Sequence, residues 1–252
     1  MIPAWLSFFD GLLAISLALA GIVSAHYGLG TPLFGFSLLL VGAVFAVIGF
    51  VAGLIGVLRT LSPQRRSSMP RAIIGIIFAL LVVLPIVGVF LTHRQYPPIN
   101  DITTDTKNPP EFVNALQIPQ NRGRDMKYNP KDAEIQEAAP AYIGLAPLKL
   151  DGHPDDVYKR VEIIAGEFPG WKITRNDPQA RTIEGVATSK LFQFKDDFII
   201  EVRPGEGGTG SLVEMRSKSR DGKGDLGANY NRIVSFFKAV QGPPRGAPSA
   251  AS

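Results

Sequence analysis

The chain of 252 residues contains no cysteine, which excludes a disulfide framework, a thiolate metal site and a cysteine nucleophile. Histidine is also scarce, because His26, His93 and His153 are the only three and no two of them have the spacing of metal ligands. Zinc sites need three or four protein ligands, and a histidine-based triad needs its base beside a nucleophile. We therefore predict no metal, no cofactor and no catalytic residue.

Charge is nearly absent from the first third of the chain. Between Asp10 and Arg59 lie 48 residues with no acidic or basic side chain other than His26. About 20 apolar residues span a bilayer core, so this run is long enough for two helices separated by a glycine- and proline-containing turn at residues 28–32. A third uncharged run follows, whose internal Pro85 a membrane helix tolerates. The predicted spans are residues 4–26, 34–58 and 72–92.

The basic residues of this region lie between the second and third apolar runs. This loop contains Arg59, Arg65, Arg66 and Arg71 and no acidic residue. Because such loops stay in the cytoplasm, we expect the N-terminus to be cytoplasmic and everything after residue 91 to be periplasmic, in a bacterial inner membrane. The first run lacks a basic start, so we interpret it as an anchor rather than a cleaved signal peptide.

The remaining charges balance. Residues 95–252 carry 21 Lys+Arg and 21 Asp+Glu, so the excess of +4 for the whole chain comes from the arginines beside the apolar runs. It reports membrane orientation and does not indicate a nucleic-acid partner.

Small residues recur inside the apolar runs. Gly49 and Gly53 form a small-xxx-small face that lets helices approach closely, either within the three-helix unit or against another membrane protein. The sequence does not separate these alternatives. Asp10 is the one acidic residue near the spans, and we interpret it as interfacial and solvated.

Residues 94–147 are rich in proline and show weak apolar periodicity, which prevents long helices. Either this segment is a spacer, or it wraps over the following domain, as its scattered apolar residues favour. Residues 242–252, rich in Pro, Gly, Ala and Ser, are expected to be disordered. The predicted regions are a membrane region at residues 1–93, an extended tether at 94–147, a domain at 148–241 and a tail at 242–252.

The domain at residues 148–241 begins and ends with amphipathic helices. The first starts at Pro154, and the last follows Asp225, which stands where a helix cap belongs. Four strands are expected between them, at residues 171–174, 182–189, 197–203 and 211–219. The predicted fold class is α+β: three transmembrane helices followed by a two-layer α/β sandwich, with a four-stranded antiparallel sheet and two helices on one face. The other face would be open to water, the tether, the membrane or a partner.

Four segments of the chain after the apolar runs form recognisable motifs. Three are short: Ile99-Asn100-Asp101-Ile102, Gly170-Trp171-Lys172-Ile173 and Phe194-Lys195-Asp196-Asp197. The most specific is Arg216-Ser217-Lys218-Ser219-Arg220-Asp221-Gly222-Lys223-Gly224-Asp225-Leu226-Gly227-Ala228-Asn229. Together they resemble a bacterial and plant family known only as a domain of unknown function, DUF1499. The resemblance implies a membrane-anchored envelope domain of the proteobacterial type and supplies no activity.

Polar residues concentrate where the last strand turns into the last helix. Free N–H groups at a helix start, with arginines nearby, can bind an anion. The residues expected to contact an anion or a partner are Arg216, Ser219, Arg220, Lys223 and Asn229. The structural alternative, which we favour because ion-pair networks imitate sites, pairs Arg216 and Arg220 with Asp196, Asp197 or Asp225.

A catalytic pair of Asp196 and Asp197 is disfavoured, because neighbours on an extended chain point to opposite faces. Ser217 and Ser219 lack a visible base, so a hydrolase ranks last. We expect a non-enzymatic accessory subunit or assembly factor of an inner-membrane complex, with the lipid bilayer and an integral-membrane protein or a second copy as partners. The alternative is an envelope module that binds a lipid or an anion.

Overall fold

The structure is a computed structural model that describes residues 2–242, apart from the side chains of residues 63 and 65. The tail predicted at 242–252 lies, after Gly242, outside the described residues. The chain divides into two compact units. Unit 1 contains residues 1–94 together with 189–194, and unit 2 contains residues 95–188 and 195–252.

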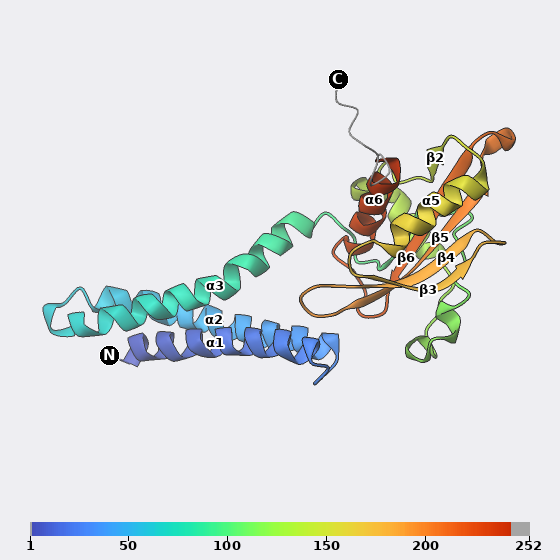
Figure 1. Cartoon of the computed structure of the whole chain (residues 1–252). Coiled ribbons are helices and arrows are strands. Elements are labelled where there is room, and N and C mark those ends of the chain that lie inside the picture. Colours follow the sequence, from blue (N-terminus) through green and yellow to red (C-terminus); the bar gives the residue numbers. More distant parts are fainter. Residues whose placement is uncertain (1, 243–252) are drawn as a thin grey trace, which may run out of the picture. The chain divides into compact units, whose positions relative to one another are not determined.

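Unit 1 consists of three long apolar helices, blue to turquoise in Figure 1. They are α1 (Ile2–His26), α2 (Pro32–Arg59) and α3 (Met69–His93), with a short 3-10 helix η1 (Pro63–Ser68) before α3. Each is long and apolar enough to cross a membrane, which confirms three apolar helices where the sequence predicted them. The turn before α2 ends at Thr31, whose side chain accepts a hydrogen bond from the Phe34 N–H at 3.1 Å.

Glycines in unit 1 lie where one helix meets another. A methyl group at Gly42 would collide with the Ala14 carbonyl, and one at Gly75 would overlap Ser7. Gly49 and Gly53 face Asp10 and Ser7 in the same way. The small-residue face is therefore occupied by packing among α1, α2 and α3, which is the first of the two alternatives that the sequence left open.

Unit 2 contains one antiparallel sheet with the strand order β1-β6-β5-β4-β3, and β2 also pairs with β6. The sheet has six strands, so the expectation of four was wrong. The two additional strands have only three residues each, too few to produce an alternating pattern in the sequence. The strands are β1 (Asp101–Thr103), β2 (Leu148–Leu150), β3 (Trp171–Asp177), β4 (Thr182–Thr188), β5 (Lys195–Pro204) and β6 (Ser211–Ser219).

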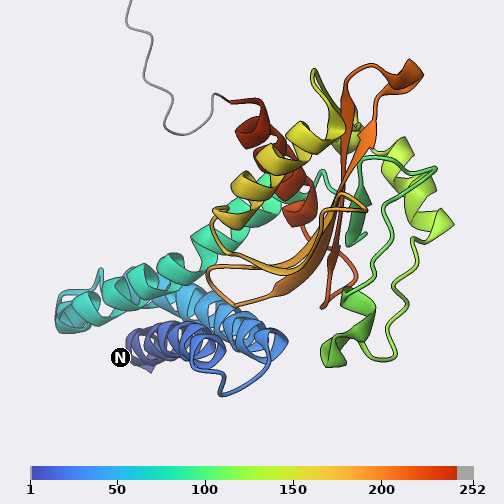
Figure 2. The same ribbon diagram turned by 45° about the vertical axis from the view of Figure 1, so that its right-hand side comes forward.

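Two helices, α5 (Pro154–Gly166) and α6 (Ala228–Gln241), cover one face of this sheet (Figures 1 and 2). Alternate residues of β5 point toward them, and the core of unit 2 forms here. We call this side the helix face. Its central side chains include Val161, Ile200, Met215, Ile233 and Phe236.

The opposite face is covered by part of the proline-rich segment, which therefore wraps over the sheet, the favoured one of the two alternatives that the sequence left open. Residues 104–128, which we call the strap, lie over β4, β5 and β6, and Phe112, Ala115 and Met126 enclose Ile199 there. We call this side of the sheet the strap face. The strap contains the 3-10 helices η2 (Ala115–Gln117) and η3 (Pro119–Asn121) and is followed by α4 (Pro130–Ala138) and η4 (Pro140–Tyr142). A last 3-10 turn, η5 (Glu206–Gly208), joins β5 to β6.

The side chain of Gln136 in α4 pairs with the outer edge of β1. Its amide accepts a hydrogen bond from the Thr103 N–H at 3.1 Å and donates one to the Thr103 carbonyl at 2.7 Å. These are the bonds that a neighbouring strand would make, so α4 covers an edge that would otherwise be open to another chain.

Candidate functional site

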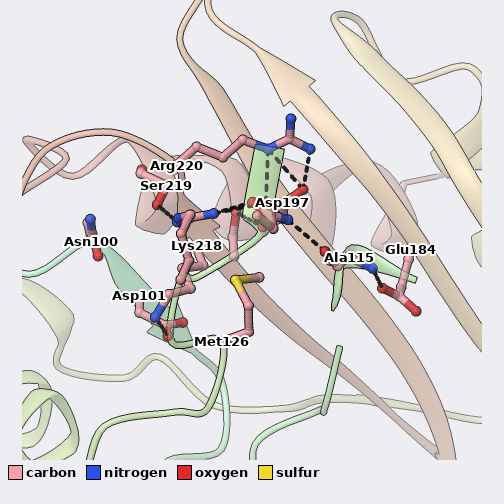
Figure 3. A network of polar contacts seen from close by, with 12 residues as sticks. Asn100, Asp101, Ala115, Met126, Glu184, Asp197, Lys218, Ser219 and Arg220 are labelled. Carbon is pink, nitrogen blue, oxygen red and sulfur yellow. Dashed lines mark hydrogen bonds and ion pairs between the residues drawn. The ribbon is translucent and has the colours of Figure 1, made fainter. Parts of the chain in front are cut away.

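The signature segment of the sequence forms β6 and the corner that leads to α6. Because side chains alternate along a strand, Arg216, Lys218 and Arg220 point to the strap face while Ser217 and Ser219 point to the helix face. The polar cluster predicted from the sequence is thus divided between the two sides of the sheet. Figure 3 shows Lys218 and Arg220 among the polar contacts around Asp101 and Asp197.

Arg216 is the centre of the strap face and is only 1% exposed. Its guanidinium donates to both carboxylate oxygens of Asp101 in β1, Nε to Oδ1 at 2.9 Å and Nη2 to Oδ2 at 2.8 Å. It also donates to the Pro110 and Met126 carbonyls of the strap, and it lies over the rings of Phe112 and Tyr128. Bidentate pairing of this kind is strong and directional, so one side chain ties β1, β6 and the strap together.

Asp101 balances this charge from a fully buried position. Besides Arg216 it holds the Lys218 ammonium, whose Nζ lies 2.8 Å from Oδ2. Burial, followed by the negative charge of Asp101, raises the pKa of the nearby Asp132 carboxyl. Asp101 lay at the start of the resemblance to the family, but its role as the partner of Arg216 was missed because 115 residues separate the two.

A second ion-pair cluster surrounds Asp197 of β5, which is also fully buried. Arg220 donates from Nη2 to Oδ1 at 2.6 Å and from Nε to Oδ2 at 3.0 Å. Asn121 of the strap donates to Oδ2 at 2.9 Å, and the Arg124 guanidinium lies 3.5 Å from the same oxygen. The structural pairing of Arg220 with Asp197 that we favoured is present, and the strap supplies two partners that the sequence did not indicate.

Asp196 points to the helix face and pairs with Arg232 of α6. Arg232 also donates to Ser217 Oγ at 2.8 Å, and Ser217 donates to the Asn229 side-chain oxygen at 2.7 Å. Asp196 and Asp197 therefore lie on opposite sides of the sheet, as strand geometry predicts, and cannot act on one substrate together.

The corner before α6 is held by Asp225. Its two oxygens accept hydrogen bonds from the N–H groups of Gly227 and Asn229, each at 2.8 Å. Burial raises the pKa of this carboxyl and the two N–H bonds oppose the rise. Gly227 has φ +79°, and any side chain there would overlap the ring of Tyr96, so this position requires glycine.

Glu184 of β4 is a third buried acid on the strap face. It accepts hydrogen bonds from three successive strap N–H groups, those of Val113 at 3.1 Å, Asn114 at 2.8 Å and Ala115 at 2.9 Å. Arg175 lies 3.6 Å from the same carboxylate. Glu184 was missed because an acidic residue in an alternating strand is typical of a solvent-facing position. The N–H groups that it accepts from lie about 70 residues away in the sequence.

The five residues expected to contact an anion or a partner differ in how accessible they are. Arg216, Ser219 and Asn229 are buried, and Arg220 is bound to Asp197. Lys223 is exposed in the loop before α6. Contact with an anion stays a prediction, and Lys223 is the cation of this set best placed to make it.

The buried acids and the arginines of this network neutralise one another's charges. Each buried acid of the strap face described above faces an arginine, and Ser217 and Ser219 hydrogen-bond to Asn229. Among residues 2–242, no group of three metal-binding side chains comes together. The arrangement joins β1, the strap and the α6 corner to one sheet.

The protein family described as "Protein of unknown function (DUF1499)" matches residues 101–240. The match begins at β1 and ends in α6, so it includes the strap, the sheet and every member of the network. No curated protein and no solved structure matches the chain. Because the matched region is more than half of the sequence and contains the signature residues of β6, this chain belongs to the DUF1499 family.

Proposed function

We propose that this protein is a non-enzymatic accessory subunit or assembly factor of an inner-membrane protein complex. The observation that carries the proposal is the position of Asp10, the ninth residue of α1. At 1.5 Å per residue it lies about 12 Å from the start of a helix that spans a hydrocarbon core of about 30 Å. Asp10 is half-buried beside Gly49, whereas we expected a solvated side chain.

One carboxylate oxygen of Asp10, Oδ2, is buried and has no hydrogen-bond partner among the described residues. An acid at membrane depth is costly, and such residues pair with other polar groups or mark functional contacts. A basic or hydrogen-bond-donating side chain on a neighbouring membrane protein would satisfy it. A second copy of the chain would bring another acid to this depth, so a different protein is the favoured partner.

The organisation of unit 2 supports the same role. Its buried acids and arginines neutralise one another, which produces a rigid body whose polar groups are committed to its own structure. Such a body suits a scaffold that a partner recognises by shape. The arginine-rich loop between α2 and α3 supports a cytoplasmic N-terminus and a periplasmic unit 2, as in membrane-anchored proteobacterial proteins.

The test is purification of the full chain from its native membrane in mild detergent. We expect a particle that contains a second membrane protein in fixed proportion. Asp10→Asn should lower the recovery of that protein about fivefold or more, since intramembrane polar contacts contribute about 1–2 kcal/mol. Ser16→Ala is the matched control, because the Ser16 hydroxyl bonds to the Leu12 carbonyl of its own helix. A strictly monomeric particle would overturn the proposal.

A further inference from the structure

The loop between β4 and β5, residues 189–194, has the composition of a membrane-contacting segment. We call it the hairpin loop, and its sequence is Ser-Lys-Leu-Phe-Gln-Phe. At its tip Leu191 is 60% exposed, and the flanking Lys190 and Lys195 are exposed as well. Apolar side chains beside lysines suit the boundary between acyl chains and phosphate groups.

The hairpin loop has a defined conformation. The Ser189 N–H donates to the Phe194 carbonyl at 2.8 Å, and the Phe194 N–H donates to the Ser189 hydroxyl at 2.9 Å. Gln193 adopts φ +58°, unusual for a residue with a side chain, and its amide donates to the Ser189 and Lys190 carbonyls, each at 3.1 Å. These bonds fix the loop in a conformation that leaves Leu191 exposed at its tip.

Residues 189–194 belong to unit 1, with the membrane helices. The rings of Phe192 and Phe194 lie 5.6 Å and 6.0 Å from the ring of Phe36. Phe36 is the fifth residue of α2, so it lies about 6 Å along the axis from the helix start, which is the depth at which aromatic rings gather at a bilayer surface.

We propose that the hairpin loop enters the interfacial layer of the bilayer, with Leu191 among the upper acyl chains and with Lys190 and Lys195 beside lipid phosphates. The loop at the other end of β5, residues 205–210, contains no apolar side chain to match. The sheet would then be anchored to lipid by one hairpin in addition to its covalent link to α3. This inference rests on the hairpin loop and its contacts with Phe36 of α2, and it is independent of any partner protein.

The absence of cysteine makes the test direct. The full chain carrying Leu191→Cys is labelled with an environment-sensitive dye and reconstituted into vesicles of phosphatidylcholine and phosphatidylglycerol. Thr209→Cys, exposed in the opposite loop, is the matched control. We expect spin-labelled lipid to quench the dye at position 191 about twofold or more above the control, and aqueous iodide to quench the control more strongly.

Two results would overturn the inference. Equal quenching of both positions by iodide would place the loop in water. Shielding of position 191 from both quenchers would place it against protein. Because Leu191 is exposed, the substitution should preserve folding, which the fluorescence of Trp171 reports. Should Leu191→Cys fail to fold, labelled Lys190→Cys serves instead, with the same lipid quenching expected at a shallower depth.

Discussion

The two faces of the sheet in unit 2 are stabilised by different interactions. On the helix face, α5 and α6 cover a mainly apolar core that contains Ile200, Met215 and Phe236. On the strap face, a segment with little regular structure is held by Arg216, Asp197 and Glu184. Helices satisfy their own backbone groups and need only an apolar contact, whereas an irregular segment brings unpaired N–H and carbonyl groups that the sheet must satisfy. Most of the buried charges lie where the covering chain is irregular, and Asp196, paired with Arg232 of α6, is the exception on the helix face.

The largest expected effect comes from removing the countercharge of Arg216. Asp101→Asn keeps the shape of the side chain but leaves a buried guanidinium without its carboxylate, which should cost about 3–5 kcal/mol of stability. Thermal unfolding is followed by Trp171 fluorescence in a Trp5→Phe background. Asp101→Leu combined with Arg216→Met should be less destabilising than Asp101→Asn. A single variant as stable as the parent would show that the strap face does not depend on this pair.

Asp197→Ala should be the next most damaging, at about 2–4 kcal/mol, because it leaves Arg220 and Asn121 without their common acceptor. Thermal unfolding is the measurement, and a lowered melting temperature of unit 2 is the expected result. Asp221→Ala, close in sequence but absent from the ion pairs of the described residues, is the control. An unchanged melting temperature for Asp197→Ala would contradict the structural role of this cluster.

Glu184→Gln tests the strap itself. The variant removes the charge that three N–H groups share, and a loss of about 1–3 kcal/mol is expected. Hydrogen exchange followed by mass spectrometry should show faster exchange at residues 113–117, while α5 stays protected. Glu134→Gln, exposed on α4, should leave exchange of the strap unchanged. Uniform loss of protection over both faces would mean that they unfold together.

The smallest effect depends on pH. Burial raises the pKa of Glu214 to about 7, opposed by Arg203 and assisted by Asp105 and Glu201. The folded protein therefore keeps a proton that the unfolded chain loses above about pH 4.5, and stability falls as pH rises from about 4.5 through 7. Glu214→Gln should remove about 1–2 kcal/mol of this dependence, allowing for solvent screening. Chemical unfolding at pH 5 and pH 8 measures it, and an equal pH dependence in both proteins would contradict this assignment.

The comparison also explains what could be predicted from the sequence. Charge-free runs of more than 20 residues identify helices that are long and apolar enough to cross a membrane, and long alternating or amphipathic segments identify β5, β6, α5 and α6. Asp225 was expected at the cap position of the last helix, but α6 begins after Gly227. Asp225 lies two residues earlier and still binds N–H groups of this corner, a local role that the sequence indicated. The helix face was therefore predictable from periodicity.

The strap face was not predictable in this way. The outermost strand on that side, β1, has only three residues. Asp101 of this strand pairs with Arg216 and Lys218, which are 115 and 117 positions away. Periodicity carries no information about such contacts. The sequence indicated that Arg216 and Arg220 needed acidic partners and offered Asp196, Asp197 or Asp225. Asp197 is the partner of Arg220, whereas Arg216 pairs with Asp101, which was not among them.

The position of Asp101 has a practical consequence for isolating unit 2. A soluble fragment that starts at residue 148, where the first amphipathic helix suggested a boundary, would lack β1 and the countercharge of Arg216. Arg216, which is buried in the full chain, would then lie on a sheet face without the strap. A fragment that starts at Gln95 keeps β1 and the strap. Unit 2 should therefore be separated from unit 1 directly after α3.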